Sequence, residues 1–141
     1  MVTKLFPYFV MNGNGQEAVA FYKEALGATV VSLQTFGDLP EDQERPLPAE
    51  VKNRIMNAHL TIGEAEFMLS DTFPGQGHDV GSHVTAALTF SDQPTTEAVF
   101  SRLKEGGTVT MELQPTFWSP AYGQVTDRFG VMWQVSAEAV E

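Results

Sequence analysis

The order of apolar and polar residues along the chain predicts short strands interrupted by two helices. Where the two kinds of residue alternate, successive side chains point to opposite faces, which is the period of a strand. Two other segments, residues 17–26 and 97–105, place their apolar side chains at the spacing of an amphipathic helix. The strand pattern occurs in residues 4–11, 29–36, 54–62, 65–70, 83–90 and 108–113, and a hairpin follows around residues 127–130.

Both predicted helices are bounded by residues that start or stop helices. Asn14 suits the N-cap of the first helix, and Glu17, three residues later, completes a variant of the capping box. Gly27 ends this helix, because glycine readily takes the left-handed conformation found after many helices. Asp92 or Thr95 is expected to cap the second helix.

The hairpin near the C-terminus organises the rest of the prediction. Aspartate starts tight turns and glycine accepts a positive φ, so residues 127–130 are expected to form the turn. In the strand that follows, Trp133 and Gln134 point to opposite faces. We expect a helix to cover the face that carries Trp133 and a ligand to lie against the face that carries Gln134.

The predicted elements repeat, since strand, helix and three strands occur twice in the same order. Residues 17–19 and 97–99 are both Glu-Ala-Val, at an offset of 80 that also relates Gly27 to Gly107. This predicts one α+β domain, residues 1–141, built from two βαβββ modules at about 1–72 and 83–141, with a linker at 73–82. One helix can cover only one face of each sheet. We therefore expect the two sheets to form a curved, half-open mixed β-barrel with the helices outside and a cavity inside.

Composition narrows the function. The net charge is −10, and the eight Lys and Arg residues are scattered, which argues against nucleic acids and acidic membrane surfaces as partners. No apolar run approaches a membrane span, and no signal peptide is evident. The absence of cysteine excludes disulfides and fits a cytoplasmic location. Residues 37–53 form a long loop that could be a lid, a binding segment or disordered.

His59 is the strongest candidate for chemistry. It shares the polar face of its predicted strand with Asn57 and Thr61. An imidazole there could act as a general base, because its pKa lies near neutrality. We favour a histidine that is hydrogen-bonded to a neighbour such as Gln134 or to water, since no partner carboxylate is evident. His78 and His83 lie in or beside the linker and have no third ligand at suitable spacing.

Aromatic residues near the hairpin could line a pocket for an apolar or planar ligand. Phe117, Trp118 and Tyr122 flank prolines, and they could equally form a lid or a dimer contact. We expect Phe9 and Met132 to face the same interior as ligand wall or filler. The predicted ligand-binding residues are Phe9, Asn57, His59, Trp118, Tyr122, Met132 and Gln134. No Cys, no Gly-x-Ser-x-Gly turn and no phosphate-binding glycine loop is present.

At this point the chain resembles the vicinal oxygen chelate superfamily, which includes glyoxalase, extradiol dioxygenases and bleomycin resistance proteins, and within it the PhnB-like branch. The resemblance rests on Pro7-Tyr8 before residues 14–28, and on Phe117-Trp118 followed by Gly123, Asp127, Phe129-Gly130 and Trp133. It implies the glyoxalase-like fold. Some PhnB-like members carry a ubiquinone-methyltransferase label, but residues 12–15 are better explained as the start of a helix than as a nucleotide-binding turn.

The resemblance also implies where a metal would bind. Metal-dependent members hold a divalent cation with His and Glu from four strands, and those positions fall at Pro7, at His59, at Thr85 or Ala87, and at Gln134. Only His59 offers a good ligand, whereas catalytic metal sites usually need about three. We therefore predict no metal site and no cofactor, with a divalent metal as the alternative.

Together these observations predict a PhnB-like protein that binds a small molecule in the cavity between its modules without the usual metal triad. One alternative is a metal-dependent lyase, isomerase or dioxygenase that uses His59. Another is a structural or interaction protein whose cavity is filled by its own side chains. A homodimer is expected, because superfamily relatives commonly pair and exposed sheet edges need cover.

Overall fold

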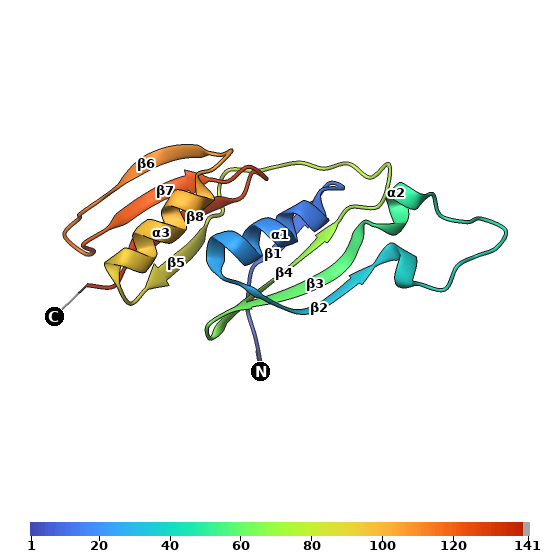
Figure 1. Cartoon of the computed structure of the whole chain (residues 1–141), viewed down its shortest axis with the longest axis horizontal. Coiled ribbons are helices and arrows are strands. Elements are labelled where there is room, and N and C mark those ends of the chain that lie inside the picture. The colour runs from blue at the N-terminus through green and yellow to red at the C-terminus, as the bar shows by residue number, and fades with distance from the viewer. Residues whose placement is uncertain (140–141) are drawn as a thin grey trace. The chain divides into compact units, whose positions relative to one another are not determined.

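The computed structural model describes residues 1–139, which form two compact units with a boundary between Asp79 and Val80. That boundary lies within the predicted 73–82 linker. Each unit contains a four-stranded sheet and one long helix, in the order strand, helix and three strands (Figure 1). The predicted α+β fold with two βαβββ modules is confirmed. The barrel that the two sheets would form together stays a prediction.

The first module has a mixed sheet in the order β1-β4-β3-β2. β1 runs parallel to β4, and the other neighbours are antiparallel. Two short helical segments lie in the long loop after β2, which was expected to have no regular structure. The elements are β1 (Tyr8–Met11), α1 (Gly15–Leu26), β2 (Thr29–Thr35), the 3-10 turn η1 (Phe36–Asp38), α2 (Ala49–Lys52), β3 (Ile55–Ile62) and β4 (Ala65–Asp71).

The second module repeats this arrangement in the order β5-β8-β7-β6, with β5 parallel to β8. Its helix begins four residues earlier than expected, because Asp92 is the N-cap and its side chain accepts a hydrogen bond from the Thr95 amide at 2.8 Å. The elements are β5 (Ala86–Phe90), α3 (Gln93–Leu103), β6 (Thr108–Gln114), β7 (Tyr122–Thr126) and β8 (Met132–Ala137).

The start of α1 differs from the predicted capping box. Asn14 occupies the N-cap, but its side chain makes no capping bond and instead accepts from the Asn12 amide at 3.3 Å. The helix start is held by the buried carboxylate of Asp71, which accepts hydrogen bonds from the Gly13 and Gly15 amides at 2.8 and 2.9 Å. The C-terminal end agrees with the prediction, since Gly27 has a left-handed φ of 67°.

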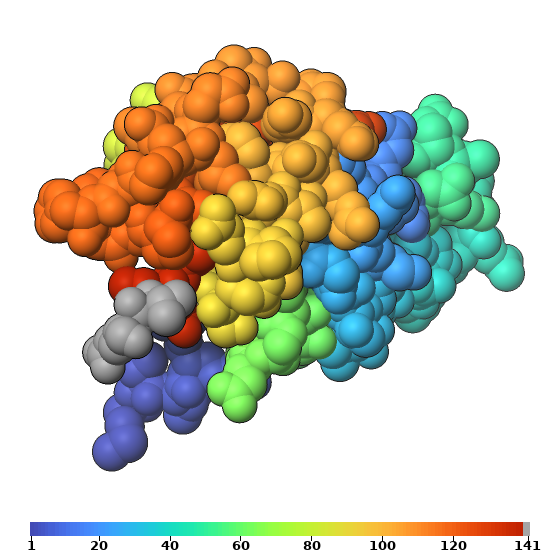
Figure 2. All heavy atoms as spheres, turned by 60° about the vertical axis from the view of Figure 1, so that its left-hand side comes forward, coloured from blue at the N-terminus to red at the C-terminus, as the bar shows by residue number. Residues whose placement is uncertain are grey.

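Each sheet buries one face beneath its own helix. In the first module the ring of Tyr22 on α1 meets the ring of Phe67 on β4 edge-on at 5.6 Å. In the second module Trp133 on β8 is 3% exposed, as predicted, on a sheet that packs against α3. Figure 2 shows α3, in yellow to light orange, seated against the later orange segments of its own module. Burial of these apolar side chains is the main source of stability in each module.

The strand register aligns the two modules residue by residue. In the first, a row across the sheet joins Tyr8, Met68, His59 and Ser32, and in the second the corresponding row joins Ala87, Gln134, Gln124 and Met111. Another pair of rows matches Thr29, Thr61 and Glu66 with Thr108, Thr126 and Met132. His59 therefore corresponds to Gln124, Glu66 to Met132, and Met68 to Gln134.

We call the face of each sheet that its own helix does not cover the open face. Because side chains alternate along a strand, the open face carries the neighbours of the buried core residues. On the first module it comprises Tyr8, Asn57, His59, Thr61, Glu66 and Met68. On the second it comprises Tyr122, Gln124, Thr126, Met132 and Gln134.

Candidate functional site

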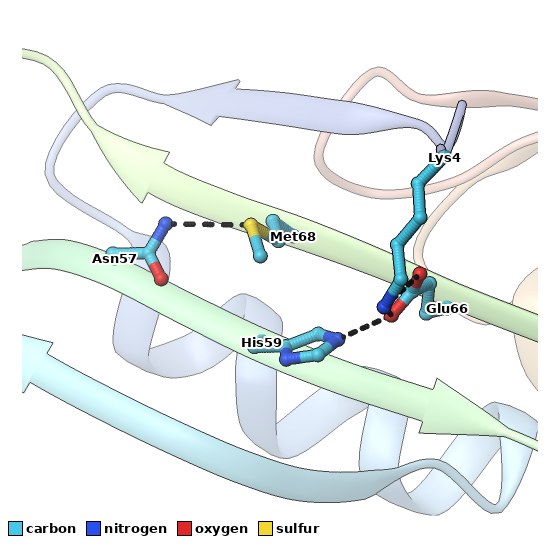
Figure 3. A network of polar contacts seen from close by, with 5 residues as sticks. All are labelled: Lys4, Asn57, His59, Glu66 and Met68. Carbon is cyan, nitrogen blue, oxygen red and sulfur yellow. Dashed lines mark hydrogen bonds and ion pairs between the residues drawn. The ribbon is translucent and has the colours of Figure 1, made fainter. Parts of the chain in front are cut away.

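The open face of the first module holds a charged cluster around His59. The Nε2 atom of His59 on β3 lies 2.8 Å from Oε2 of Glu66 on β4. The other carboxylate oxygen of Glu66, Oε1, lies 3.1 Å from Nζ of Lys4 (Figure 3). His59 is paired with Met68 across the two strands, so Glu66, two residues before Met68, points from the same face. The hairpin thus places the two side chains diagonally opposite each other.

These contacts set the charge of Glu66. The hydrogen bond from His59, followed by the one from Lys4, holds the pKa of the Glu66 carboxyl below its ordinary value of 4.5, although partial burial opposes the shift. Glu66 is therefore a carboxylate at neutral pH. The side chains of His59 and Glu66 are 19% and 20% exposed, so both can be reached from solvent.

The expectation that His59 has no partner carboxylate is wrong. Glu66 is seven residues away in the sequence and reaches His59 only through the turn between β3 and β4. The signal was present in Gly63-Glu64, which the sequence analysis could have used to pair the two strands residue by residue. Asn57 lies on the same face, as predicted. Its Nδ2 atom makes long contacts, 3.6 Å to the sulfur of Met68 and 3.4 Å to the hydroxyl of Tyr8 (Figure 3).

The open face of the second module carries a neutral polar chain. Nε2 of Gln124 donates to the Tyr122 hydroxyl at 3.0 Å, and that hydroxyl donates to Oε1 of Gln134 at 2.6 Å. Nε2 of Gln134 then donates to the Thr85 hydroxyl at 2.8 Å. We call these four residues the amide chain. Because all donors point the same way, each bond polarises the next.

An aromatic pair adjoins the amide chain. The ring of Trp118 lies edge-on to that of Tyr122, with centroids 5.3 Å apart, and Phe117 packs edge-on against Trp118 at 4.8 Å. Trp118 is 50% exposed and Phe117 is 98% exposed. The loop is anchored by the buried hydroxyl of Ser119, which donates to the carbonyls of Ala121 and Ala137 at 2.9 and 2.6 Å. Trp118 is therefore presented beside Tyr122 by a fixed backbone.

Phe9 does not lie where we placed it. Its ring packs 6.1 Å from Tyr22 and 5.6 Å from Phe67, so it belongs to the core beneath α1. The strand begins at Tyr8, and alternation turns Tyr8 and Val10 to the open face instead. Met132 does lie on an open face, that of the second module. The ligand-binding roles of Asn57, His59, Trp118, Tyr122, Met132 and Gln134 stay predictions.

The residues at the implied metal positions do not fit a divalent cation. Pro7 and Ala87 have no side-chain donor, and the amide oxygen of Gln134 accepts from Tyr122. His59 already binds Glu66 through Nε2. Among residues 1–139, no group of three or more His, Asp or Glu side chains is placed to hold a metal ion. A hard cation needs several oxygen or nitrogen donors converging on one point, and the described side chains do not supply them.

Two further candidates are occupied by structural contacts. Nε2 of His78 lies 2.8 Å from the Val10 carbonyl, so this histidine covers the edge strand β1. The Gly13 and Gly15 amides bind Asp71, which supports the interpretation of residues 12–15 as a helix start. No helix within residues 1–139 is long and apolar enough to cross a membrane.

Known proteins share this sequence and fold. The model of the Glyoxalase/Bleomycin resistance protein/Dioxygenase superfamily matches residues 4–135. Protein YjdN of Escherichia coli (strain K12) is 31% identical over 138 residues, which cover 94% of this chain and 93% of YjdN. The crystal structure of PA1353 from Pseudomonas aeruginosa is 38% identical with a TM-score of 0.84, covering 97% of this chain and 98% of that one. The PhnB protein of Bacillus cereus, 21% identical, has a TM-score of 0.75 over 96% of this chain and 99% of its own, and so shares the fold.

Proposed function

The chain belongs to the glyoxalase/bleomycin resistance protein/dioxygenase superfamily, and from this premise we propose that it binds a small molecule on the open faces of its sheets without a resident metal. The observation that carries the proposal is the half-exposed ring of Trp118 beside Tyr122, whose hydroxyl is bonded to Gln134. An exposed aromatic ring next to fixed donors and acceptors is the usual composition of a small-molecule site.

The amide chain supports a neutral ligand. Its members have no formal charge, and each internal bond uses only part of the capacity of an amide group. Gln134 keeps a second N–H, and Gln124 keeps its carbonyl oxygen, so a ligand can both accept and donate here. A planar molecule with an uncharged polar edge would place its ring on Trp118 and its edge on these groups. An ionised ligand would find no opposite charge on this face.

Several further predictions belong to this proposal. We propose that the open faces of both modules line one cavity, that the protein is a homodimer and that it works in the cytoplasm. Exposed edge strands support the dimer, because unpaired backbone groups favour association with another chain. The interpretation as a structural protein with a filled cavity is the outcome if no ligand binds.

The test uses the neutral dye N-phenyl-1-naphthylamine, whose emission rises when it enters an apolar site. Saturable binding to the wild-type chain is expected, and Trp118→Ala should weaken it about tenfold, since stacking on an aromatic ring contributes roughly 1 kcal/mol. Phe73→Ala, which removes another exposed aromatic ring, is the matched control and should leave affinity unchanged. Equal affinity in wild type and Trp118→Ala would contradict the proposal. So would stoichiometric, tightly held Ni, Zn, Mn or Fe in the purified protein.

A second candidate function is an enzyme of the lyase or isomerase type that uses His59. It is favoured by one observation, the 2.8 Å contact between His59 and Glu66 on the open face of the first module. A carboxylate that orients an imidazole is a recurrent arrangement in acid–base catalysis. It needs no metal, which matters because the donor set does not fit one.

A further inference from the structure

We propose that His59 and Glu66 form a proton-accepting site in which Glu66 positions the imidazole and Nδ1 of His59 takes a proton from a small carbon acid. This inference deepens the second candidate function and rests on it. His59 is the catalytic residue of the proposal, because it would touch the reacting atom. Glu66 is a positioning residue, because it would act only through His59.

The hydrogen bond to Glu66 selects the tautomer of His59. A carboxylate can only accept, so the neutral imidazole must carry its proton on Nε2, 2.8 Å from Oε2 of Glu66. The lone pair then lies on Nδ1. Figure 3 shows this second ring nitrogen on the side of the imidazole away from Glu66, and no side chain or backbone group among residues 1–139 bonds it. A substrate can therefore approach a free acceptor.

Lys4 completes the arrangement by occupying the rest of the carboxylate. Its Nζ atom binds Oε1 at 3.1 Å, which leaves Oε2 facing His59. Lys4 also favours the ionised form of Glu66, whose pKa is lowered. When Nδ1 accepts a proton, the resulting imidazolium faces a carboxylate that is already charged. No group must be reorganised or desolvated at that moment, which is the advantage of a preformed charge.

The neighbours of His59 indicate the class of substrate. Asn57, two residues earlier on the same face, spends its Nδ2 hydrogens on contacts of 3.4 and 3.6 Å, so its N–H can turn to a better acceptor. Met68, opposite His59, offers an apolar thioether surface. Together they suit a small molecule with a C–H next to a carbonyl. The C–H proton moves to Nδ1, and the electron pair stays on the substrate as an enolate whose oxygen accepts from Asn57. The same proton is then returned to another carbon.

The fold itself does not require this charged pair. The second module has the same strand order and register, yet Gln124 stands at the position of His59 and Met132 at that of Glu66. No cation corresponds to Lys4 among the described contacts of that face. A sheet of this kind is therefore stable without the pair, and its presence on only one module points to a role beyond packing.

The reactivity of His59 can be measured with 5-nitrobenzisoxazole, a neutral carbon acid. A base removes its ring C–H proton, the N–O bond breaks, and the phenolate product absorbs visible light. His59→Gln should lower the rate with the full protein at least tenfold, because a positioned base contributes roughly 10²–10⁴-fold. Glu66→Gln should give an intermediate rate, and the matched control His83→Gln should equal wild type. A His59→Gln rate equal to wild type, or an equal loss in His83→Gln, would overturn the proposal.

The positioning role needs a readout that a merely structural contact would not move. Nitrogen-15 NMR at about pH 9, where an ordinary imidazole is neutral, should show the proton of His59 on Nε2 in the wild type. Glu66→Gln should shift part of the population to the Nδ1–H tautomer without lowering the melting temperature by more than a few degrees. A wild-type His59 protonated on Nδ1 would sink the proposal. Dye binding through Trp118 tests a different face, so failure there leaves these measurements unaffected.

Discussion

The two modules differ on one face of their sheets and agree on the other. On the face beneath each helix, Phe67 corresponds to Trp133 and Leu69 to Val135, and all four are buried. These pairs conserve apolar character while volume changes, because the opposing helix can repack around a different shape but cannot hydrate a polar group. The helix-covered face therefore records the requirements of folding.

The open faces follow no such rule. His59 and Glu66 on the first module stand where the second has Gln124 and Met132. A charged pair and a neutral amide chain thus occupy equivalent positions on the same scaffold. The difference teaches that in a duplicated sheet the two faces change independently, and that the residues to examine for function are the mismatched pairs on the open side.

The modules also use a buried aspartate in different places. Asp71 accepts from the amides of Gly13, Gly15 and Ile55, and so joins the start of α1 to β3 and β4. Asp127 accepts from the amides of Phe129 and Val131 and from the indole Nε1 of Trp133, at 2.8, 3.1 and 2.8 Å. One carboxylate ties a helix to the sheet, and the other closes the hairpin. Both serve backbone groups that water cannot reach.

The largest effect is expected from removing these carboxylates. Asp71→Ala leaves three buried N–H groups without an acceptor, which should cost about 3 kcal/mol or more of unfolding free energy. Asp127→Ala should cost a similar amount and should expose Trp133, which a red shift in tryptophan emission would report. Urea unfolding measures both, and Asp79→Ala at an exposed position is the control. A loss below about 1 kcal/mol in either variant would end the comparison of the two aspartates.

A smaller effect is expected from adding one methyl group where the modules are tightly packed. A Cβ on Gly15 would lie 2.6 Å from Oδ2 of Asp71, and one on Gly123 would lie 2.8 Å from the ring of Phe100. Gly15→Ala and Gly123→Ala should each destabilise by about 1–3 kcal/mol, the usual cost of overpacking. Gly77→Ala has open space and should be close to neutral. Thermal melts compare the three, and a Gly15→Ala protein as stable as Gly77→Ala would show that the helix start yields easily.

The smallest effect is the acid dependence of stability, and it sharpens the contrast between the modules. The hydrogen bond from His59 lowers the pKa of Glu66 below 4.5, and the Thr95 backbone amide lowers the pKa of Asp92 below 3.8. A group with a lowered folded pKa stabilises above its unfolded value and loses that contribution as the pH falls through the folded value. Stability should therefore decline below about pH 4.5, and slightly less steeply in Glu66→Gln and in Asp92→Asn.

Salt distinguishes the two contributions. The partners of Glu66 include the charged Lys4, whereas those of Asp92 are the amide and hydroxyl of Thr95. Added NaCl at about 1 M should reduce the difference between wild type and Glu66→Gln more than that between wild type and Asp92→Asn, because salt screens interactions between exposed charges. Melting temperatures at pH 6 and pH 3 provide the measurement. An equal response to salt would mean that Lys4 adds nothing to Glu66.

Much of this molecule followed from its sequence alone. The order of strands and helices, the duplication, the burial of Trp133 and the end of α1 at Gly27 depend on periodicity and on the conformational range of single residues. Near neighbours in the chain determine these properties. The sequence also placed Asn57 and His59 on one polar face, because alternation within a strand needs no knowledge of its partners.

Only the tertiary structure decided which distant groups meet. Glu66 reaches His59 across a hairpin, Asp71 replaces Asn14 at the start of α1 from 56 positions away, and Phe9 turns beneath the helix. Each outcome depends on the register between strands, in which a shift of one residue would send every side chain to the opposite face. Register is set by the packing of the whole module. For that reason the pattern of the chain determined the faces, and the folded sheet determined the chemistry that gathers on them.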